Sequence, residues 1–427
     1  MLYFGPHMTK LSIVGLGYVG LPLAYAFAKA GHTVTGYDIS KPRIEELKRS
    51  HDWTLELTDE QLQSVTMNFT TDPVELEACE VIILAIPTPV DSRNNPDLSL
   101  VENATKTVGK HVKKGMIIVY ESTVYPGVTE DLCGPILEHE SGLKCGVDFT
   151  LGYSPERINP GDKLHTIDKI IKVVAGQDEK TTDILCELYG SIVSAGIHRA
   201  SSIKVAEMAK AIENAQRDLN IAYVNEIAVL CNHIGIPTKD VLAAAGTKWN
   251  FLKFQPGLVG GHCIGVDPYY LVEKAKQLGM QTHMIDKGRA VNDAMPLYIV
   301  HEIAKRLPSP ASKRVLVLGL TFKENIPDTR NSKAGDVAIH LAKLGYVTEV
   351  HDPFVTREEI MKKKMTPGSL ENGPYDAIIF LVPHKEYLVA GLDGMLKALK
   401  KGGVLYDLKS LLDPKKVADD GKNYMAL

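Results

Sequence analysis

No stretch of this sequence is long and apolar enough to cross a membrane, and no segment has the order of a signal peptide. A bilayer crossing takes about 18 consecutive apolar residues, and no run in the chain reaches that length. The N-terminus lacks the succession of charged, apolar and small residues that marks a secretory signal. Residues 2–7 precede Met8 and the first strand-like pattern, so we treat them as an expression remnant outside the fold. We therefore expect a cytoplasmic protein without membrane contact.

Cysteine pairs and excess positive charge are absent as well. The formal net charge of -4 provides no basic surface field for a nucleic acid, so we expect no nucleic-acid partner. The cysteines have neither CxxC spacing nor neighbouring paired histidines, which argues against a disulfide scaffold and a zinc site. No metal is expected, and a cysteine that matters should matter as a thiol. The six are Cys79, Cys133, Cys145, Cys186, Cys231 and Cys263.

The composition is that of a folded enzyme with more than one domain. The hydrophobic fraction of 44% and the charged fraction of 23% are near the average, and 427 residues exceed one ordinary core. From Lys10 onward, short apolar runs alternate with helix-like stretches, as in a parallel sheet covered on both faces. The first domain should extend to about Ala200. The apolar runs are 11–14, 33–38, 81–86 and 116–120.

A single long helix is predicted after this domain. Between Ser201 and Ile234 there is neither proline nor glycine, and apolar residues recur mostly at steps of three or four. A helix of this length would bridge domains or pair subunits. Polar residues form a second stripe, for which a solvent-exposed face is the simplest interpretation. The apolar positions are Val205, Met208, Ile212, Leu219, Tyr223 and Leu230, and the polar ones are Glu207, Lys210, Asn214 and Arg217.

A second β-α pattern opens at Arg314. The segment 307–312, rich in proline and serine, marks a boundary before it. Gly319 ends the first strand, but residues 320–325 do not supply the two further glycines of a dinucleotide loop. The sequence thus predicts an α/β protein with two Rossmann-like doubly wound domains joined by a long central helix, of which only the first binds a dinucleotide. The later apolar runs are 347–351, 377–382 and 404–406, and the predicted domains are 8–200, 201–306 and 313–427.

The first strand is followed by a dinucleotide fingerprint. Residues 15–20 read GLGYVG between a strand and a helix, where glycines permit a tight turn and the helix N-terminus faces pyrophosphate. Asp38 ends the next strand, where a carboxylate accepts hydrogen bonds from ribose hydroxyls and would repel a 2′-phosphate. NAD is therefore favoured over NADP. The alternative is an ordinary glycine turn with a surface aspartate.

A glycine-flanked cysteine forms the second constellation. Cys263 lies in residues 257–268, GLVGGHCIGVDP, where the glycines could leave its sulfur open to attack a carbonyl carbon. Taken alone, a cysteine is more often buried filler. Asp267, followed by proline, suits the N-cap of a helix, which does not exclude a catalytic part. Glu156 follows an apolar run in a turn-rich segment and is by itself equally an exposed loop acid.

Together these segments resemble the UDP-glucose and GDP-mannose dehydrogenase family over nearly the whole chain from Met8. The resemblance is specific because it combines many motifs. It implies an N-terminal NAD domain, a central helical element that forms dimers and a C-terminal domain that holds a UDP-sugar, assembled as a homodimer or larger homo-oligomer. The matching motifs are GLGYVG with Asp38, 86–89, 121–127, 154–156, 207–214, GGHC at 260–263, 321–323 and 328–330.

By motif position, the resemblance also implies roles for individual residues. The catalytic residues implied are the covalent nucleophile Cys263, the oxyanion and water-positioning groups Lys210 and Asn214, the proton-transfer partners Asp267 and Glu156, and the water contact Thr123. Those implied in NAD binding are Gly15, Gly17, Tyr18, Val19, Gly20, Asp38, Arg43, Pro87, Thr88, Thr123 and Arg330. Those implied in substrate binding are Glu156, Arg157, Asn159, Lys210, Asn214, Phe251, Phe254, Gly257, Gly260, Cys263 and Lys323.

Such chemistry needs a thiol. Oxidising an alcohol to an acid takes two hydride transfers, and the aldehyde between them becomes a good hydride donor only after a nucleophile adds to its carbonyl. Cys263 can supply that addition, and water would then hydrolyse the resulting thioester. A lysine ammonium and an asparagine amide are suitable partners for the negative charge that develops.

Departures from the family pattern set the expected substrate. UDP-glucose enzymes usually have serine before the cysteine and an acid in the loop after Ser-Pro-Glu, whereas this chain has His262 and Asn-Pro-Gly at 159–161. Lys409 also stands where that branch often has arginine. The chain is more similar to enzymes of UDP-N-acetylhexosamines, with UDP-GlcNAc or UDP-GalNAc ahead of UDP-ManNAc and UDP-glucose. A two-electron hydroxyacid dehydrogenase of similar layout and a non-catalytic nucleotide-sugar sensor are the competing hypotheses.

Overall fold

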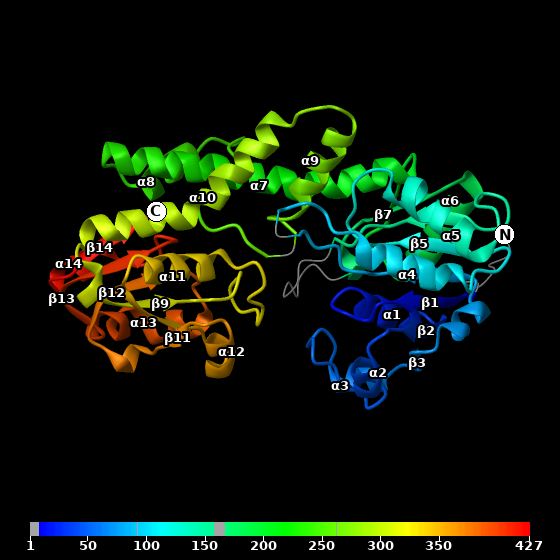
Figure 1. Cartoon of the computed structure of the whole chain (residues 1–427), viewed down its shortest axis with the longest axis horizontal. Helices are drawn as coiled ribbons and strands as arrows, with labels where there is room; N and C mark the ends of the chain where they lie inside the picture. The colour runs from blue at the N-terminus through cyan, green and yellow to red at the C-terminus, as the bar shows by residue number, and fades with distance from the viewer. Residues whose placement is uncertain (1–7, 92, 158–166, 262) are drawn as a thin grey trace. The chain divides into compact units, whose positions relative to one another are not determined.

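Two units make up the computed structural model, which describes residues 8–91, 93–157, 167–261 and 263–427. The N-terminal unit comprises residues 1–213 and 269–280, and the C-terminal unit comprises residues 214–268 and 281–427. The boundary between them falls within α7 (Ile203–Ile234), the long helix drawn in green in Figure 1.

The N-terminal unit is built on one twisted sheet. Among the described residues the strand order is β3-β2-β1-β4-β5-β6-β7-β8, the first part of which is the 3-2-1-4-5-6 order of a dinucleotide-binding fold. Neighbouring strands are parallel except β6 and β7, which are antiparallel. The strands are β1 (Lys10–Val14), β2 (Thr33–Tyr37), β3 (Asn68–Thr70), β4 (Val81–Leu84), β5 (Ile117–Tyr120), β6 (Thr150–Tyr153), β7 (Lys172–Gly176) and β8 (Ile197–Arg199).

The helices of this unit bury apolar faces against that sheet. Leu21, Leu23 and Phe27 of α1 are fully buried together with Leu11 and Ile13 of β1, in one core cluster. The helices are α1 (Gly20–Lys29), α2 (Lys41–Leu47), α3 (Asp59–Gln63), α4 (Ser99–Gly109), α5 (Gly134–Ser141) and α6 (Glu179–Gly190), while α9 (Asp267–Gln277) starts two residues before the part of it that belongs to this unit.

The C-terminal unit repeats the same strand order in a second sheet. Its described strands follow the order β11-β10-β9-β12-β13-β14, all parallel. The strands are β9 (Arg314–Leu318), β10 (Val347–His351), β11 (Thr366–Pro367), β12 (Tyr375–Phe380), β13 (Leu399–Asp407) and β14 (Asn423–Ala426). The helices are α8 (Thr238–Ala245), α10 (His283–Arg306), α11 (Lys333–Lys343), α12 (Arg357–Lys362), α13 (Lys385–Lys397) and α14 (Pro414–Asp419). The predicted fold class, two doubly wound units with a long central helix, is confirmed.

The turn after the first strand of the second sheet begins like a dinucleotide-binding loop, but the acid that would bind a ribose is already hydrogen-bonded within the protein. Gly319 has a φ of +97°, like Gly15 at +91°, and each donates its N–H to the end of the next strand. Asp352 follows β10 as Asp38 follows β2, but it is 3% exposed and lies 3.0 Å from Nε2 of the buried His384. Because the Asp352 carboxylate is buried and hydrogen-bonded to His384, it is not available to accept a hydrogen bond from a ribose.

The orientation of α7 differs from the simplest interpretation of its two stripes. Glu207, Lys210 and Asn214 are only 0%, 8% and 5% exposed, so the prediction of a solvent-exposed polar face was wrong for them, although Arg217 is exposed. Three alanines, Ala206, Ala211 and Ala215, are buried beside them at 0–3% exposure. Five of the predicted apolar positions are instead 44–59% exposed: Val205, Met208, Ile212, Tyr223 and Leu230.

The described ranges contain neither a membrane-spanning helix nor a metal-binding cluster. None of the helices described combines the length and the apolar character that a bilayer crossing requires. Within the residues that the structure describes, no group of three or more His, Cys, Asp or Glu side chains could hold a metal ion.

Candidate functional site

The GLGYVG turn has the backbone geometry of a phosphate-binding loop. A Cβ on Gly20 would lie 1.8 Å from the carbonyl oxygen of Gly15, whereas one on Gly17 would meet nothing within 4 Å. The start of α1 therefore packs so closely on the turn that only glycine fits at position 20, whereas the turn is open at position 17. Val19 caps α1 without a side-chain hydrogen bond. Of the first three helical residues, Leu21 donates its N–H to the Gly17 carbonyl at 3.2 Å and Pro22 has no N–H, so the Gly20 N–H is the one that this helix start can offer to a pyrophosphate.

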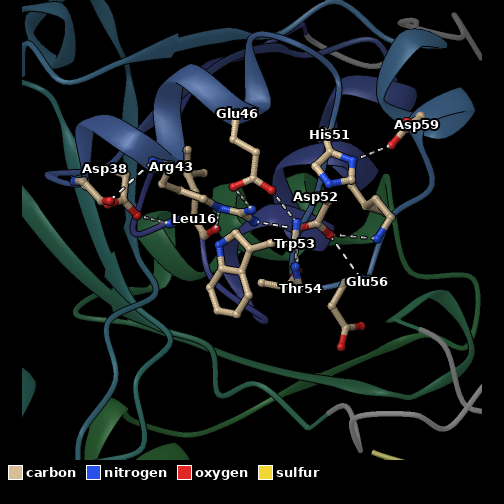
Figure 2. Close-up of polar contacts among 12 residues, drawn as sticks. Leu16, Asp38, Arg43, Glu46, His51, Asp52, Trp53, Thr54, Glu56 and Asp59 are labelled. Carbon is tan, nitrogen blue, oxygen red and sulfur yellow. Dashed lines mark hydrogen bonds and ion pairs between the residues drawn. The ribbon is translucent and has the colours of Figure 1, made fainter. Parts of the chain in front are cut away.

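Two side chains hold this turn in place (Figure 2). Asp38 accepts hydrogen bonds from the backbone N–H groups of Leu16 at 2.9 Å and Ser40 at 2.8 Å. Arg43, which is 5% exposed, donates from Nε to the Leu16 carbonyl at 2.9 Å and from Nη2 to Asp52 Oδ1 at 2.8 Å. Asp38, which follows β2, and Arg43 of α2 thus both contact Leu16 of the fingerprint. A direct contact of Arg43 with NAD stays a prediction.

The loops after β4 and β5 are fastened to each other. The Ser122 hydroxyl donates to the carbonyl of Ile86 at 2.6 Å and accepts from its N–H at 3.1 Å. The Thr88 hydroxyl donates to the Thr123 carbonyl at 2.8 Å. Since both loops leave the carboxyl edge of the sheet, where ligands of such folds bind, the structure brings together three predicted NAD residues, Pro87, Thr88 and Thr123.

A buried carboxylate connects α7 to the segment after β5. Glu207 accepts the backbone N–H groups of Gly127 at 2.6 Å and Thr129 at 2.9 Å. Its burial raises the pKa of Glu207 to about 7, because a desolvated carboxylate favours its neutral form. The polar stripe of α7 therefore has a structural function at this position.

Glu156, the predicted proton-transfer residue, faces a buried lysine. Glu156 Oε2 lies 3.4 Å from Lys172 Nζ, and Oε1 accepts the N–H of Arg157 at 2.6 Å. The Arg157 guanidinium pairs with Glu213 of α7 through Nη2 at 2.6 Å and Nε at 3.3 Å. Arg157 is thus held by α7, while Asn159 lies outside the described residues.

Cys263 is exposed, as a reactive thiol requires and buried filler would not be. Its carbonyl accepts the N–H groups of Val266 at 3.0 Å and Asp267 at 2.8 Å, so the turn leads directly into α9. Asp267 is 2% exposed and accepts a hydrogen bond from Asn214 Nδ2 at 2.6 Å. The helix begins at Asp267 itself rather than after it. His262 lies outside the described residues.

The segment before the cysteine is fixed by an asparagine of α7. Asn225, fully buried, accepts the Gly257 N–H at 2.8 Å and donates to the Gly257 carbonyl at 3.0 Å. It also donates to Asn292 Oδ1 at 2.8 Å, and Asn292 donates to Asp218 Oδ1 at 2.7 Å. Burial raises the pKa of Asp218, and the Arg289 guanidinium acts in the opposite direction. This network holds one of the predicted substrate residues, Gly257, from the helix side.

The glycines of the GGHC motif pack against the loop that follows β9. A Cβ on Gly260 would lie 2.4 Å from the Asn331 carbonyl oxygen. Gly261, with a φ of +84°, donates its N–H to the same oxygen at 3.3 Å. The loop after β9 also carries Lys323 and Arg330. Within the C-terminal unit, the structure therefore joins the motif that contains the cysteine to the segment predicted to hold the nucleotide.

Family comparisons agree with this arrangement along the chain. Three domain models of one family match in order: the NAD-binding domain over residues 9–193, the central domain over 204–294 and the UDP-binding domain over 316–414. The chain belongs to the UDP-glucose/GDP-mannose dehydrogenase family.

Individual relatives are similar over almost their full length. A UDP-N-acetyl-D-glucosamine 6-dehydrogenase of Pseudomonas aeruginosa is 49% identical over 414 residues, which is 95% of this chain and 98% of the relative. The enzyme of the same name from Salmonella typhi is 45% identical over 416 residues, 96% and 98% of the two chains. A solved UDP-D-ManNAc dehydrogenase from Pyrococcus horikoshii matches with a TM-score of 0.87 at 30% identity, covering 97% of this chain and 98% of that one.

Membership of the UDP-glucose/GDP-mannose dehydrogenase family confirms several expectations. The family resemblance, the dehydrogenase class and NAD as the cofactor are as predicted. The UDP-binding domain model matches the unit without a second fingerprint. The three domain boundaries and the roles of single residues, including the half-buried Phe251 and Phe254, stay predictions.

Sequence reasoning about this dehydrogenase missed residues that act through others. Asn225 gave no signal, because an asparagine inside a helix is usually solvated. Lys172 did offer a sequence signal, because a charged residue at the start of a buried apolar run needs an oppositely charged partner. Glu121 lay within a recognised motif, but no role was assigned to it.

Proposed function

We propose that this enzyme oxidises the C6 alcohol of UDP-N-acetylglucosamine to the carboxylate in two NAD-dependent steps through a covalent bond to Cys263. The observation that carries the proposal is the exposed Cys263 in the turn just before the buried Asp267–Asn214 pair. The names of the relatives at 49% and 45% identity support the choice of substrate. UDP-GalNAc is the next candidate, ahead of UDP-ManNAc and UDP-glucose.

The reaction balances as one alcohol, one water and two NAD⁺ giving one carboxylate, two NADH and three protons. Bound NAD would accept a hydride in each oxidation. Between the two, the Cys263 sulfur adds to the aldehyde carbon, so that a C–S bond forms and the carbonyl oxygen takes up the electron pair. Loss of the second hydride leaves a thioester. Water then adds to the same carbon, the C–S bond breaks and the thiolate is released.

Side chains of α7 and α9 are proposed to stabilise the charge that develops on the oxygen. Lys210 and Asn214 are one turn apart on α7 and both are buried, at 8% and 5% exposure. A preorganised donor of this kind contributes roughly 3 kcal/mol to a tetrahedral transition state. The 2.6 Å bond from Asn214 to Asp267 fixes the orientation of the amide. Glu156 would accept a proton, with Thr123 in contact with the reacting water.

The test is a panel of UDP-sugars incubated with NAD and read by NADH absorbance. UDP-N-acetylglucosamine should yield two NADH per sugar, and Cys263→Ser should abolish that full yield. One NADH per sugar, or unchanged overall turnover of Cys263→Ser, would favour a two-electron hydroxyacid dehydrogenase. Calorimetric binding of a UDP-sugar without any NADH formation would favour a nucleotide-sugar sensor.

We also propose a homodimer, with the exposed apolar stripe of α7 as the contact surface. Met208 and Ile212 are 44% and 47% exposed, and Tyr223 and Leu230 are 59% and 53% exposed. Apolar side chains repeated along one helix suit a second copy of the same helix. Ile212→Glu with Tyr223→Glu should yield monomers in analytical ultracentrifugation, whereas an unchanged sedimentation coefficient would refute the surface. A cytoplasmic location accords with six cysteines that form no disulfide and is tested by cell fractionation.

A further inference from the structure

Lys172 is a buried lysine that lies at the carboxyl edge of the sheet because its strand, β7, runs opposite to β6. The parallel strands β5 and β6 end at this edge with Tyr120 and Tyr153, whereas β7 runs antiparallel to β6 and begins at Lys172. The carboxyl ends of parallel strands are where catalytic groups of doubly wound sheets collect. Because β7 is antiparallel to β6, β7 begins at the edge where β5 and β6 end. Its first side chain, Lys172, therefore lies among the groups at this edge.

The Lys172 side chain is 4% exposed, and its ammonium group contacts three oxygen atoms. Its Nζ lies 3.0 Å from Glu121 Oε2, 3.2 Å from the Pro155 carbonyl and 3.4 Å from Glu156 Oε2. The Tyr189 hydroxyl donates to the other oxygen of Glu121 at 2.6 Å. Lys172 therefore contacts both the backbone and the side chain of the Ser-Pro-Glu segment.

Charge in this cluster is unequal, with one cation between two carboxylates. Burial raises the pKa of Glu121, against the effects of Lys172 and the Tyr189 hydroxyl. Although burial acts to lower it, the carboxylates of Glu121 and Glu156 raise the pKa of Lys172. The lysine thus stays charged. Glu121 is fully enclosed, whereas Glu156 is 11% exposed and is the carboxylate that can reach a ligand.

We propose that Lys172 is a positioning residue whose ion pair fixes the Glu156 carboxylate at the sheet edge, where Glu156 acts as a proton acceptor. Glu121 and Tyr189 position Lys172 in turn. The inference rests on the proposed function, in which Glu156 transfers a proton. Among the residues that the structure describes, Arg157 follows Glu156 and pairs with Glu213 of α7, and Glu121 shares Lys172 with Glu156.

The test compares pH profiles of NADH formation from the UDP-sugar. Lys172→Met removes the cation, and because an opposite charge within about 4 Å favours the ionised carboxylate by one unit or more, the acidic limb of kcat/KM should move up by about one pH unit. Lys172→Arg keeps the charge and should leave the limb near its wild-type position. Lys114→Met is the matched control, since Lys114 forms an exposed ion pair with Asp148 at 2.9 Å.

Stability and positioning are separated by a double variant. Lys172→Met leaves Glu121 buried without its cation, so the melting temperature should fall. Glu121→Gln added to it removes that charge, and the melting temperature should recover while the acidic limb stays above the wild-type position. A limb that returns fully to wild type in the double variant, or that never moves in Lys172→Met, overturns the inference.

A readout without turnover distinguishes this inference from the proposed function. In protein labelled with ¹³C at the glutamate carboxyl carbons, the Glu156 signal is the one lost in Glu156→Gln. It should titrate at higher pH in Lys172→Met than in wild type, and an unchanged titration refutes the positioning role. Should the wild type make no NADH from any UDP-sugar, the proposed function fails and the NMR comparison still decides about Lys172.

Discussion

Replacing Asn225 by alanine should loosen the predicted substrate segment without touching the NAD-binding unit. Asn225 is fully buried and makes three hydrogen bonds, two with the backbone of Gly257 and one with Asn292. The substitution removes all three and leaves the peptide groups of Gly257 without these partners. At about 1 kcal/mol for each lost bond, the free energy of unfolding of the C-terminal unit should fall by about 3 kcal/mol.

The assay combines urea denaturation with binding of UDP alone. We take about half of the 3 kcal/mol as the free energy needed to order the segment again when UDP binds. UDP affinity should then weaken about tenfold, because about 1.4 kcal/mol corresponds to one factor of ten. The affinity for NAD should stay at the wild-type value.

Asn232→Ala is the matched control for this change. Asn232 lies two turns further along α7, is exposed and makes one bond, from Nδ2 to the Tyr298 hydroxyl at 2.9 Å. An exposed substitution of this kind changes stability by at most about 0.5 kcal/mol. The reasoning is refuted if Asn225→Ala and Asn232→Ala have equal effects, or if Asn225→Ala weakens NAD binding as much as UDP binding.

Two further predictions concern the N-terminal unit. Gly20→Ala should lower both the melting temperature and the NAD affinity, because the new Cβ would lie 1.8 Å from the Gly15 carbonyl oxygen. Gly17→Ala should keep the melting temperature and weaken only NAD binding, because a Cβ there meets nothing within 4 Å. Equal melting temperatures of the two variants would count against this reasoning. For Glu207, the folded-state pKa of about 7 exceeds the ordinary value of 4.5, so the folded state binds the proton more tightly and stability should decline as pH rises between these values, by up to about 3 kcal/mol. Urea denaturation at pH 5 and pH 8 should show this loss in the wild type and not in Glu207→Gln, and parallel pH dependence in both would disprove the assignment.

The two stripes of α7 illustrate how far a sequence pattern reaches. Periodicity correctly predicted one helix near 201–234, observed as Ile203–Ile234. It could not say which stripe is buried, because a helix with two distinct faces satisfies the same period in either orientation. The buried positions Glu207 and Asn214 have polar partners, the N–H of Gly127 and the carboxylate of Asp267, that lie far away in the sequence.

The sequence by itself determined the local features: the GLGYVG turn with its acid at Asp38, the alternation of strands and helices, and the glycine-flanked cysteine. These features follow from backbone conformations and periods that span a few residues, so they can be recognised along the chain. Only the tertiary structure decided which groups meet. The reversal of β7 brings Lys172 to Glu156, and Asn225 reaches Gly257 across 32 residues, because such contacts depend on how whole elements pack and not on any pattern along the chain.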